Sequence, residues 1–392
     1  MRKIDKFSVY LLSICCLFIF LCTVHYLRGR PLWLDEQSVF KSVEQNSTLD
    51  FFTKPLQAGQ IFPRLYLCVI QKTAQWTGLS VWGVRLLPFI SMLLAFYVWL
   101  QVGRLALKDN KQYLVFVFCW IASVPLIYYS AELKQYSMDV LVSGCFTLFL
   151  YHQENLARNL SSLKYTILLV SLPFLGLFSY PAFLFMIFPL YNMLTVLRRQ
   201  WLQIGLYAMV CMIVVAMLYA FDLGTTHVTM DTQGFLDYSL SFQSVPEFFR
   251  SLGEGTMNLF SRWFTEQPRF MKRIGIFFMV WGMIFIPWAF FRKWKQGDRQ
   301  FTSVELLALP LYIELLILGA LKKYPFTVPR TSLFYCPITF LMTIKAMDFI
   351  KTLNERAYQF IMAGFVIFLL IVSVGIVKVV MTTNLGSICF IW

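Results

Sequence analysis

The chain has 392 residues, of which 58% are hydrophobic and only 14% are charged, and its formal net charge is +14. Soluble globular domains carry about a quarter of their residues as charged side chains, so this composition excludes that class. The basic residues form short clusters between long apolar stretches, which is typical of the loops that orient a membrane protein. We therefore expect an integral membrane protein whose partners include membrane lipids but no nucleic acid.

Cysteine and histidine give no sign of a metal centre. The nine cysteines include no CxxC pair and no Cys/His cluster, and His25, His152 and His227 are far apart in the sequence. These patterns predict no disulfide framework, no metal site and no required cofactor, although they leave a divalent metal at an acidic pair open. The basic start of the chain and its long apolar run lack a small-residue cleavage site, so we expect an uncleaved signal anchor.

Apolar stretches long enough to cross a bilayer, about 20 residues, recur along the whole chain. In chain order the clear candidates are Phe7–Leu27, Val84–Gly103, Gln112–Tyr129, Tyr136–Tyr151, Trp201–Phe221, Ile274–Phe291, Leu306–Leu321, Thr331–Ile344 and Ala357–Val377. The stretch Tyr165–Leu197 is long for one span and short for two, and Pro173 and Pro181 interrupt it around Ser179.

The positive-inside rule resolves the number of spans. With the N-terminus inside and a hairpin turning near Ser179, the inside segments hold the basic clusters of residues 104–111, 158–164, 198–199, 292–299 and 345–356. A single span at residues 165–197 would move the clusters 198–199 and 292–299 outside. The pattern therefore predicts one polytopic all-α membrane domain, residues 1–392, with about 11 spans and the C-terminus outside.

Three outer segments follow from this topology: residues 28–82, 222–271 and 322–330. In the first, Ile61–Trp76 mixes apolar and basic residues and predicts a helix lying in the membrane interface. The second is rich in aromatic residues and glycine, a composition that suits a cover over the substrate and equally suits plain membrane packing. The third carries the cations Lys322, Lys323 and Arg330 on the outer side, against the positive-inside trend.

Ionisable residues gather at the predicted membrane boundary in two places. The stretch Tyr128–Asp139, reading YYSAELKQYSMD, sets two acids and a lysine at the junction of two spans, and Asp35 and Glu36 follow the first span. Charged groups at such a boundary are costly and usually face a cavity or a partner. Because the topology puts both places outside, they outline one polar site. An ion pair that closes a tight helical hairpin explains the first stretch equally well.

Several motifs occur in a fixed order along the chain, namely PLWLDE, KPLQAGQIFPRLYL, VRLLPF, YYSAELKQYSMDV, FSYPA and YPFTVPRTSLFYCP. In this order they resemble the polytopic GT-C glycosyltransferases, in the branch related to protein O-mannosyltransferases and lipid A aminoarabinose transferases. The resemblance extends from Met1 to about Ile350 and implies a GT-C-like bundle. It also implies an enzyme that takes a sugar from a polyprenyl phosphate and acts on the outer face.

The resemblance implies that Asp35 is the catalytic base, which takes the proton of an acceptor hydroxyl and contributes about 10²–10⁴-fold to the rate. Glu36 is then a supporting acid, and a plain helix start is the alternative for both residues. Arg330 is implied as a ligand of the donor phosphate, where fixed cations stabilise the charge of the leaving group. Lys134 and Arg85 are further candidates for contact with that phosphate. Headgroup binding explains the neighbouring lysines of the third segment.

Six further residues are candidates for contact with the donor sugar or the acceptor: Glu132, Tyr136, Asp139, Gln60, Arg64 and Lys54. A structural pair between Lys134 and Asp139 explains part of this set as well. Glu314 stands in the middle of a span, where we expect it to face the bundle in a structural role.

The sequence thus predicts a transferase that moves a sugar from a polyprenyl phosphate to a hydroxyl-bearing glycan, lipid or protein. We expect it in the plasma (inner) membrane of a bacterium, with its site on the periplasmic or extracellular side. A polymerase or ligase of lipid-linked glycans is the second interpretation, although such proteins rely on loop arginines more than on a first-loop acidic pair. A lipid-sugar flippase is the third, and it would favour charges at mid-membrane depth and related half-repeats.

Overall fold

The computed structural model describes residues 5–57, 60–196, 201–223, 239–261, 263–264, 269–298, 300–326 and 328–382. Residues 224–238 of the predicted second outer loop and the inside cluster 198–199 lie outside the described residues. Throughout the described ranges every regular element is a helix, so the all-α prediction is confirmed.

The elements of the first half of the chain are α1 (Lys6–Leu27), α2 (Leu34–Gln45), α3 (Asp50–Thr53), α4 (Arg64–Trp76), α5 (Val81–Ala106), α6 (Asn110–Ile121), α7 (Val124–Tyr129), α8 (Tyr136–Asn159), α9 (Ser162–Ser171), η2 (Leu172–Leu177) and α10 (Ala182–Val196). Those of the second half are α11 (Trp201–Leu218), η3 (Tyr219–Leu223), α12 (Val245–Ser261), α13 (Arg269–Lys295), α14 (Val304–Ala320), η6 (Pro329–Tyr335), α15 (Cys336–Leu353) and α16 (Glu355–Thr382).

Six helical stretches in the described part of the chain are long and apolar enough to cross a membrane, namely Lys6–Leu27, Val81–Ala106, Trp201–Asp222, Phe270–Lys295, Arg330–Leu353 and Glu355–Thr382. The protein is therefore a multi-pass membrane protein. Two shorter apolar segments, Ser162–Leu177 and Ala182–Thr195, divide the ambiguous stretch around residues 178–181. This break is where the hairpin was predicted to turn.

One predicted span differs from the structure. The stretch Gln112–Tyr129 was expected to be continuous, but it is divided into α6 and α7 at Ala122 and Ser123. Pro125 accounts for the break, because proline has no backbone N–H to give to a helix interior yet fits the first turn of a new helix. The short α7 therefore ends close to the conspicuous stretch that begins at Tyr128.

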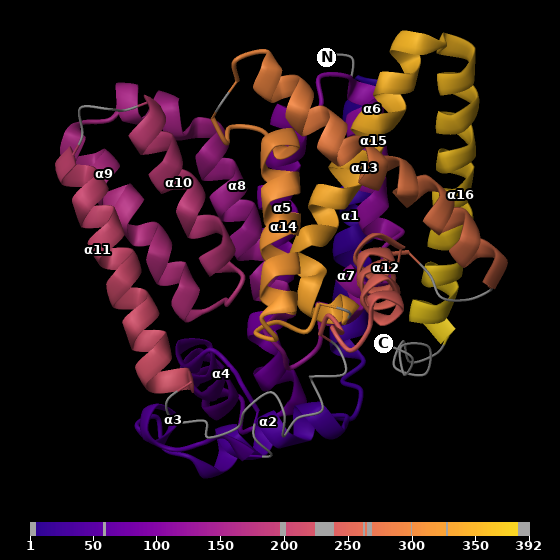
Figure 1. Cartoon of the computed structure of the whole chain (residues 1–392). Coiled ribbons are helices and arrows are strands. Elements are labelled where there is room, and N and C mark those ends of the chain that lie inside the picture. The colour runs from indigo at the N-terminus through magenta and orange to yellow at the C-terminus, as the bar shows by residue number, and fades with distance from the viewer. Residues whose placement is uncertain are drawn as a thin grey trace.

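The helices form two groups in Figure 1, with α8–α11 on one side, α13, α15 and α16 on the other, and α14 between them. The short helices α2, α3 and α4 lie together at one end of the bundle, which we call the loop end. Helix α4 packs on α5, and η6 packs on α8, so distant parts of the sequence meet at this end. The predicted interfacial helix Ile61–Trp76 is thus present as α4.

A small apolar cluster, separate from the main core, holds the loop end together. Its fully buried members come from α2, α3, α4, α5 and the segment before α8, and they include Val39, Phe51, Tyr66, Ile70 and Leu133. Burial of such side chains contributes about 1.5–3 kcal/mol each. This cluster fixes the start of α2 against the segment 130–135, and it thereby sets the positions of the acidic pair and the lysine.

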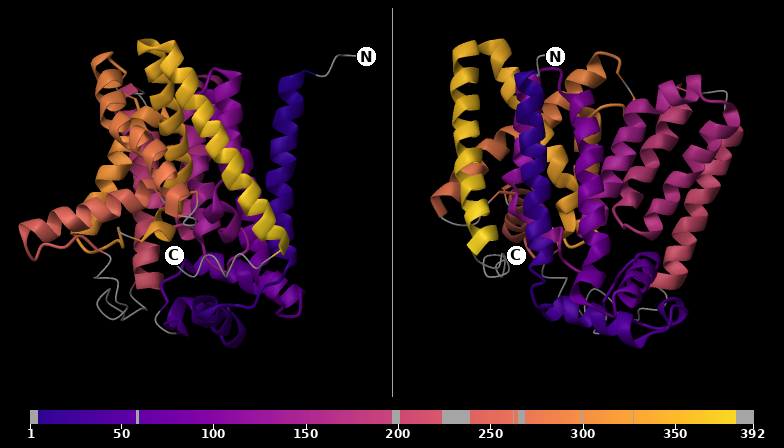
Figure 2. Two further views of the ribbon diagram at one scale, coloured as in Figure 1. Left: turned by 90° about the vertical axis from the view of Figure 1, so that its right-hand side faces the viewer. Right: turned by 180° about the vertical axis from the view of Figure 1, so that it is seen from behind.

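Helix α12 differs from its neighbours because it runs roughly at right angles to the bundle and projects from it (Figure 2, left). Its later part is buried, with Gly255 and Leu259 inside the structure, whereas Val245 and Phe249 near its start are largely exposed. A side chain that is apolar and exposed in a membrane protein is a natural contact for lipid.

Candidate functional site

The two acids of the first outer segment lie in the first turn of α2. Trp33 precedes the helix in an extended conformation, and its backbone N–H donates to Glu36 Oε2 at 3.3 Å. Acidic side chains are favourable here because they face the unpaired N–H groups and the positive end of the helix dipole. Successive positions on a helix point in different directions, so Asp35 and Glu36 have different surroundings.

Asp35 belongs to a loosely held group of charges, the Asp35 group. Its Oδ2 atom lies 3.6 Å from Lys134 Nζ and 3.6 Å from Arg330 Nη1, and its side chain is 28% exposed. Gln60 bridges the group, since it donates to Asp35 at 3.4 Å and accepts from Lys134 at 2.7 Å. Both cation contacts are longer than a hydrogen bond, so the carboxylate is oriented without being saturated.

Glu36 is the centre of a tight and fully buried group, the Glu36 group. Arg85 donates to both carboxylate oxygens at 3.0 and 2.6 Å, and Arg30 lies 3.1 Å from Oε2. The backbone N–H of Leu133 donates to Oε1 at 2.7 Å. A buried carboxylate needs such a set of donors, because an unpaired charge in the interior is strongly unfavourable. Glu36 therefore joins the start of α2 to α5 and to the segment 130–135.

The segment that carries Glu132 and Lys134 is held in place by its backbone. Besides the bond from Leu133 to Glu36, the Lys134 carbonyl accepts from the Tyr66 hydroxyl at 3.1 Å. The Ser137 hydroxyl donates to the Tyr129 carbonyl at 2.6 Å. Burial lowers the pKa of the Lys134 ammonium, and the carboxylates of Asp35 and Glu132 oppose that shift.

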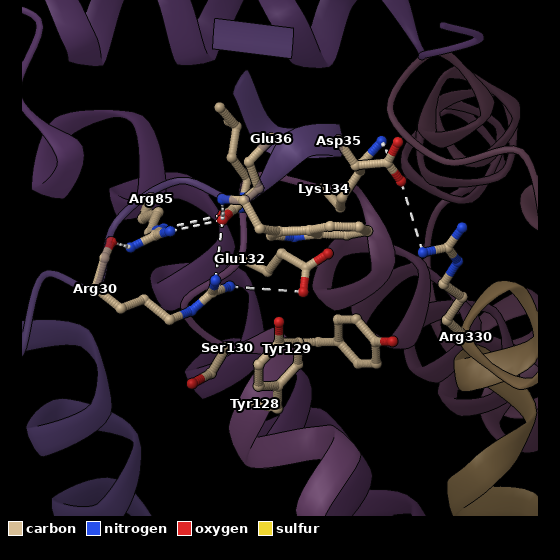
Figure 3. A network of polar contacts seen from close by, with 12 residues as sticks. Arg30, Asp35, Glu36, Arg85, Tyr128, Tyr129, Ser130, Glu132, Lys134 and Arg330 are labelled. Atoms are coloured by element: carbon tan, nitrogen blue, oxygen red, sulfur yellow. Dashed lines mark hydrogen bonds and ion pairs between the residues drawn. The ribbon is translucent and has the colours of Figure 1, made fainter. Parts of the chain in front are cut away.

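Glu132 is buried but incompletely paired. Its side chain is 1% exposed, and its nearest cation is Arg30 at 3.7 Å. Neither carboxylate oxygen has a hydrogen-bond partner among the described residues. Burial raises the pKa of Glu132 to about 7, the nearby Glu36 adds to the rise, and Arg30, Lys134 and Arg330 oppose it. Figure 3 shows Glu132 between Arg30 on one side and Arg330 on the other.

Aromatic rings line the same region. The Arg330 guanidinium lies over the Trp33 ring, 5.7 Å from its centroid, and the Arg30 guanidinium lies over Tyr128 at 4.8 Å. Tyr129 and Tyr136 pack edge to face with their centroids 4.9 Å apart. Two further buried polar atoms, Trp33 Nε1 and Gln135 Oε1, have no hydrogen-bond partner among the described residues.

A second buried ion pair lies at the junction of α4 and η3. Arg64 Nε is 3.3 Å from Asp222 Oδ1, and the Tyr180 hydroxyl donates to Asp222 Oδ2 at 2.9 Å. Nearby, the Ser179 hydroxyl donates to Asp139 at 2.7 Å. Burial lowers the pKa of Arg64, whereas Asp222 raises it. This arrangement ties the turn between η2 and α10 to the loop end.

The structure brings together only part of the predicted site. Lys134, Gln60 and Arg330 surround Asp35. Glu132 lies between Arg30 and Arg330 (Figure 3). Lys54 does not join the group; it pairs with Asp50 at 2.9 Å and is 62% exposed.

Three other predicted contact residues have protein partners instead. Arg85 is 1% exposed and binds Glu36 and the carbonyl of Arg30, Arg64 binds Asp222, and Asp139 binds Ser179. The predicted pair between Lys134 and Asp139 is therefore not formed, and Lys134 faces Asp35. Tyr136 is buried beside Tyr129.

Arg30 and Asp222 are members of these groups that the sequence analysis missed. Arg30 is a cation on the predicted outer side, which is the same exception to the positive-inside rule that singled out Arg330. Asp222 is an acid at the very end of an apolar span, as Asp35 is near the end of another. Both signals were present, but neither residue lies in a conspicuous motif. In the described ranges no three His, Cys, Asp or Glu side chains gather as a possible metal-binding set.

Comparisons with known proteins identify the fold. No family model matches the chain, and no curated protein sequence matches it. Two solved structures do: ArnT from Cupriavidus metallidurans in the apo state, and the same protein bound to undecaprenyl phosphate. The TM-score is 0.51 for both, with 14% and 13% sequence identity, and the matches cover 95% and 97% of this chain and 73% of ArnT. The chain therefore has an ArnT-like fold, which confirms the kind of helical membrane bundle expected from the sequence.

Proposed function

We propose that the protein is a membrane glycosyltransferase that moves a sugar from a polyprenyl-phosphate donor to a hydroxyl acceptor. The observation that carries this proposal is the Asp35 group, in which one half-open carboxylate faces the cations Lys134 and Arg330 at 3.6 Å. The group lies at an end of a membrane bundle, where a lipid phosphate and a water-borne acceptor can meet. The ArnT fold, which has been seen with undecaprenyl phosphate bound, supports a lipid-linked donor.

The balance of charge favours an anionic ligand. Arg30, Arg85, Lys134 and Arg330 face the acids Asp35, Glu36 and Glu132, so the cations exceed the acids by one, or by two when Glu132 holds a proton. A sugar linked to a polyprenyl phosphate is a phosphodiester with a single negative charge. Lys134 and Arg330 are the cations whose contacts are loose enough to accept its oxygens.

The reaction then follows from the placement of these groups. The acceptor oxygen forms a bond to the anomeric carbon of the sugar, and the bond from that carbon to the phosphate oxygen breaks with its electron pair left on phosphate. Asp35 takes the proton of the acceptor hydroxyl. Lys134 and Arg330 stabilise the second negative charge that develops on the polyprenyl phosphate. The charge lost at Asp35 reappears on the phosphate, so the total charge of the site does not change.

The sugar end of the donor is assigned to the atoms that lack partners. The two oxygens of Glu132 and Gln135 Oε1 are available as acceptors for the sugar hydroxyls, and Trp33 Nε1 is available as a donor. A hydroxylated ring matches this set, because each of its hydroxyls both donates and accepts. Tyr129 and Tyr136 supply aromatic walls. Glu36 and Arg85 act in this proposal as supports that hold α2 and the segment 130–135 in register.

We place this site on the outer face of a bacterial plasma membrane. The basic clusters that the positive-inside rule assigns to the interior include residues at the ends of α5, α13 and α15, opposite the loop end (Figure 1). In sealed cells, Ser241→Cys should react with a membrane-impermeant thiol reagent and Gln296→Cys should be protected. The reverse pattern would overturn the assigned orientation.

The function is tested with purified protein in lipid vesicles. The vesicles contain one polyprenyl-phosphate sugar, and candidate acceptors with free hydroxyls are supplied outside. The expected result is release of polyprenyl phosphate in equal amount to glycosylated acceptor, and its loss in Asp35→Asn. Movement of the intact donor between leaflets without release of phosphate would instead identify a flippase. Chain growth on a lipid-linked glycan would identify a polymerase.

A further inference from the structure

Phe326 occupies a slot between two helices close to Arg330. Its ring is 2% exposed and lies against Gly255 of α12 and Gly319 of α14. It also lies beside Tyr312 of α14, and the centroids of the Phe326 and Tyr312 rings are 6.4 Å apart. The hydroxyls of Thr256 and Tyr312 are hydrogen-bonded at 2.7 Å, which fixes one wall of the slot against the other. We call Gly255, Gly319 and Tyr312 the Phe326 slot.

Both glycines are required by the closeness of this contact. A Cβ atom on Gly255 would overlap the edge of the Phe326 ring, at Cδ1 and Cε1. A Cβ atom on Gly319 would lie 2.8 Å from the Cβ of Phe326, next to the backbone. The first overlap is relieved when the ring is removed, but the second is not. By contrast, Gly253 on the same helix has nothing within 4 Å of an added Cβ.

Hydrogen bonds connect Tyr324 and Pro325 to Val328 and Thr331. The Val328 N–H donates to the Pro325 carbonyl at 3.1 Å, and the Thr331 hydroxyl donates to the Val328 carbonyl at 2.8 Å. The Tyr324 hydroxyl also donates to the Thr331 carbonyl. These bonds fasten residues 328 and 331 to residues 324 and 325, and Arg330 extends from this part of the chain toward Asp35.

We propose that Phe326 is a positioning residue, which couples the position of α12 to that of the Arg330 guanidinium. The proposal rests on the proposed function, in which Arg330 binds the donor phosphate. Phe326 itself does not touch the donor. Helix α12 projects from the bundle with Val245 and Phe249 exposed, so its first turns are open to contact with lipid (Figure 2). A shift of α12 displaces Phe326 and thereby changes the contact between Arg330 and the phosphate.

The test is a double-mutant cycle read by binding of undecaprenyl phosphate to purified protein, with kcat and KM for transfer measured separately. Gly255→Ala should weaken binding about tenfold. The added methyl group overpacks the slot and displaces Phe326, and with it Arg330. KM for the donor should rise more than kcat falls. Gly253→Ala, the matched control on α12, should bind like the native protein. Equal affinity of the Gly255→Ala and Gly253→Ala proteins would overturn the proposal.

The combination with Phe326→Ala separates coupling from general damage. In the Phe326→Ala background, Gly255→Ala should not weaken binding further, because the ring that it overlaps is absent. Gly319→Ala should still weaken binding in this background, since its overlap is with the Cβ atom of residue 326. Additive effects of Gly255→Ala and Phe326→Ala would refute the coupling, and because the double variant removes the overlap, misfolding cannot explain them. If Arg330→Ala itself binds normally, the proposed phosphate contact fails, which is a different outcome from failure of the slot.

Discussion

Asp35 and Glu36 are neighbours in the sequence, yet their surroundings are opposite. Glu36 is 0% exposed and is contacted by two arginines and two backbone N–H groups, the closest contact being 2.6 Å. Asp35 is 28% exposed, and its two cations stay at 3.6 Å. Glu36 has no capacity left for a substrate, whereas Asp35 has. The difference arises from one step along α2, which turns one side chain into the interior and the other toward the open side.

The comparison teaches which charged group serves the fold and which is available for chemistry. A buried carboxylate is kept only where its donors are complete, because the loss of one partner leaves an uncompensated charge. A general base must instead reach the proton it takes, and it needs a free oxygen. Each variant below disturbs one side of this contrast.

Asp35→Asn should have the largest effect on the reaction. The amide keeps the shape of the side chain but cannot accept the acceptor proton, so transfer should fall at least about 10²-fold. Binding of the donor should be retained, since Lys134 and Arg330 are still present. Transfer rate and donor affinity are measured on the same preparation. Normal turnover by this variant would show that Asp35 is not the base.

Glu36→Gln should mainly affect stability. It leaves Arg85 buried without a compensating charge and Arg30 with only Glu132, at 3.7 Å. Removal of one partner of a buried pair typically destabilises by about 3–5 kcal/mol. The thermal unfolding midpoint in detergent should fall clearly. Adding Arg85→Met removes a second charge, so the double variant should lose less than the sum of the two single variants. Independent, additive losses would contradict the central place of Glu36 in its group.

The sequence predicted the membrane class, the broken apolar stretch around Ser179 and the helix α4, because hydropathy and proline positions act locally. The GT-C-like bundle was implied by the family resemblance of the ordered motifs. Only the family resemblance distinguished Asp35 as the base from Glu36 as a supporting acid. The residue pattern alone does not, since the surroundings of two adjacent residues are decided by where α2 packs. Arg85 and Arg64 were also named as candidates for substrate contact, whereas in the structure they pair with Glu36 and Asp222. These partners are distant in the chain, and only the packing of α2, α4 and α5 brings them together.

Arg330→Ala should weaken donor binding by about 1–3 kcal/mol, as expected for the loss of a charged hydrogen bond to phosphate. The effect should shrink as salt is raised, because the side chain is 21% exposed and its charge is screened. Binding of undecaprenyl phosphate is measured at two salt concentrations. Lys322→Ala, at an exposed cation of the same outer segment, is the control and should change affinity little. Donor affinity equal to the native value would remove Arg330 from the phosphate site.

Glu132→Gln should have the smallest effect, and pH reveals it. The folded-state pKa of about 7 is above the ordinary value of 4.5, so between these values the folded protein holds a proton that the unfolded chain has lost. Stability therefore falls as pH rises from about 4.5 and levels off above about 7.

The glutamine variant does not titrate at this position. The free energy of unfolding of this variant, relative to that of the native protein, should therefore rise by roughly 1–3 kcal/mol between pH 5 and pH 8. The unfolding midpoint follows this change. Glu247→Gln, at an exposed carboxylate of α12, is the control and should follow the native curve. Saturating donor should reduce the difference, because sugar hydroxyls that donate to Glu132 stabilise its ionised form. A pH-independent difference between the two proteins would mean that Glu132 is already fully paired, and the assignment of its oxygens to the sugar would be lost.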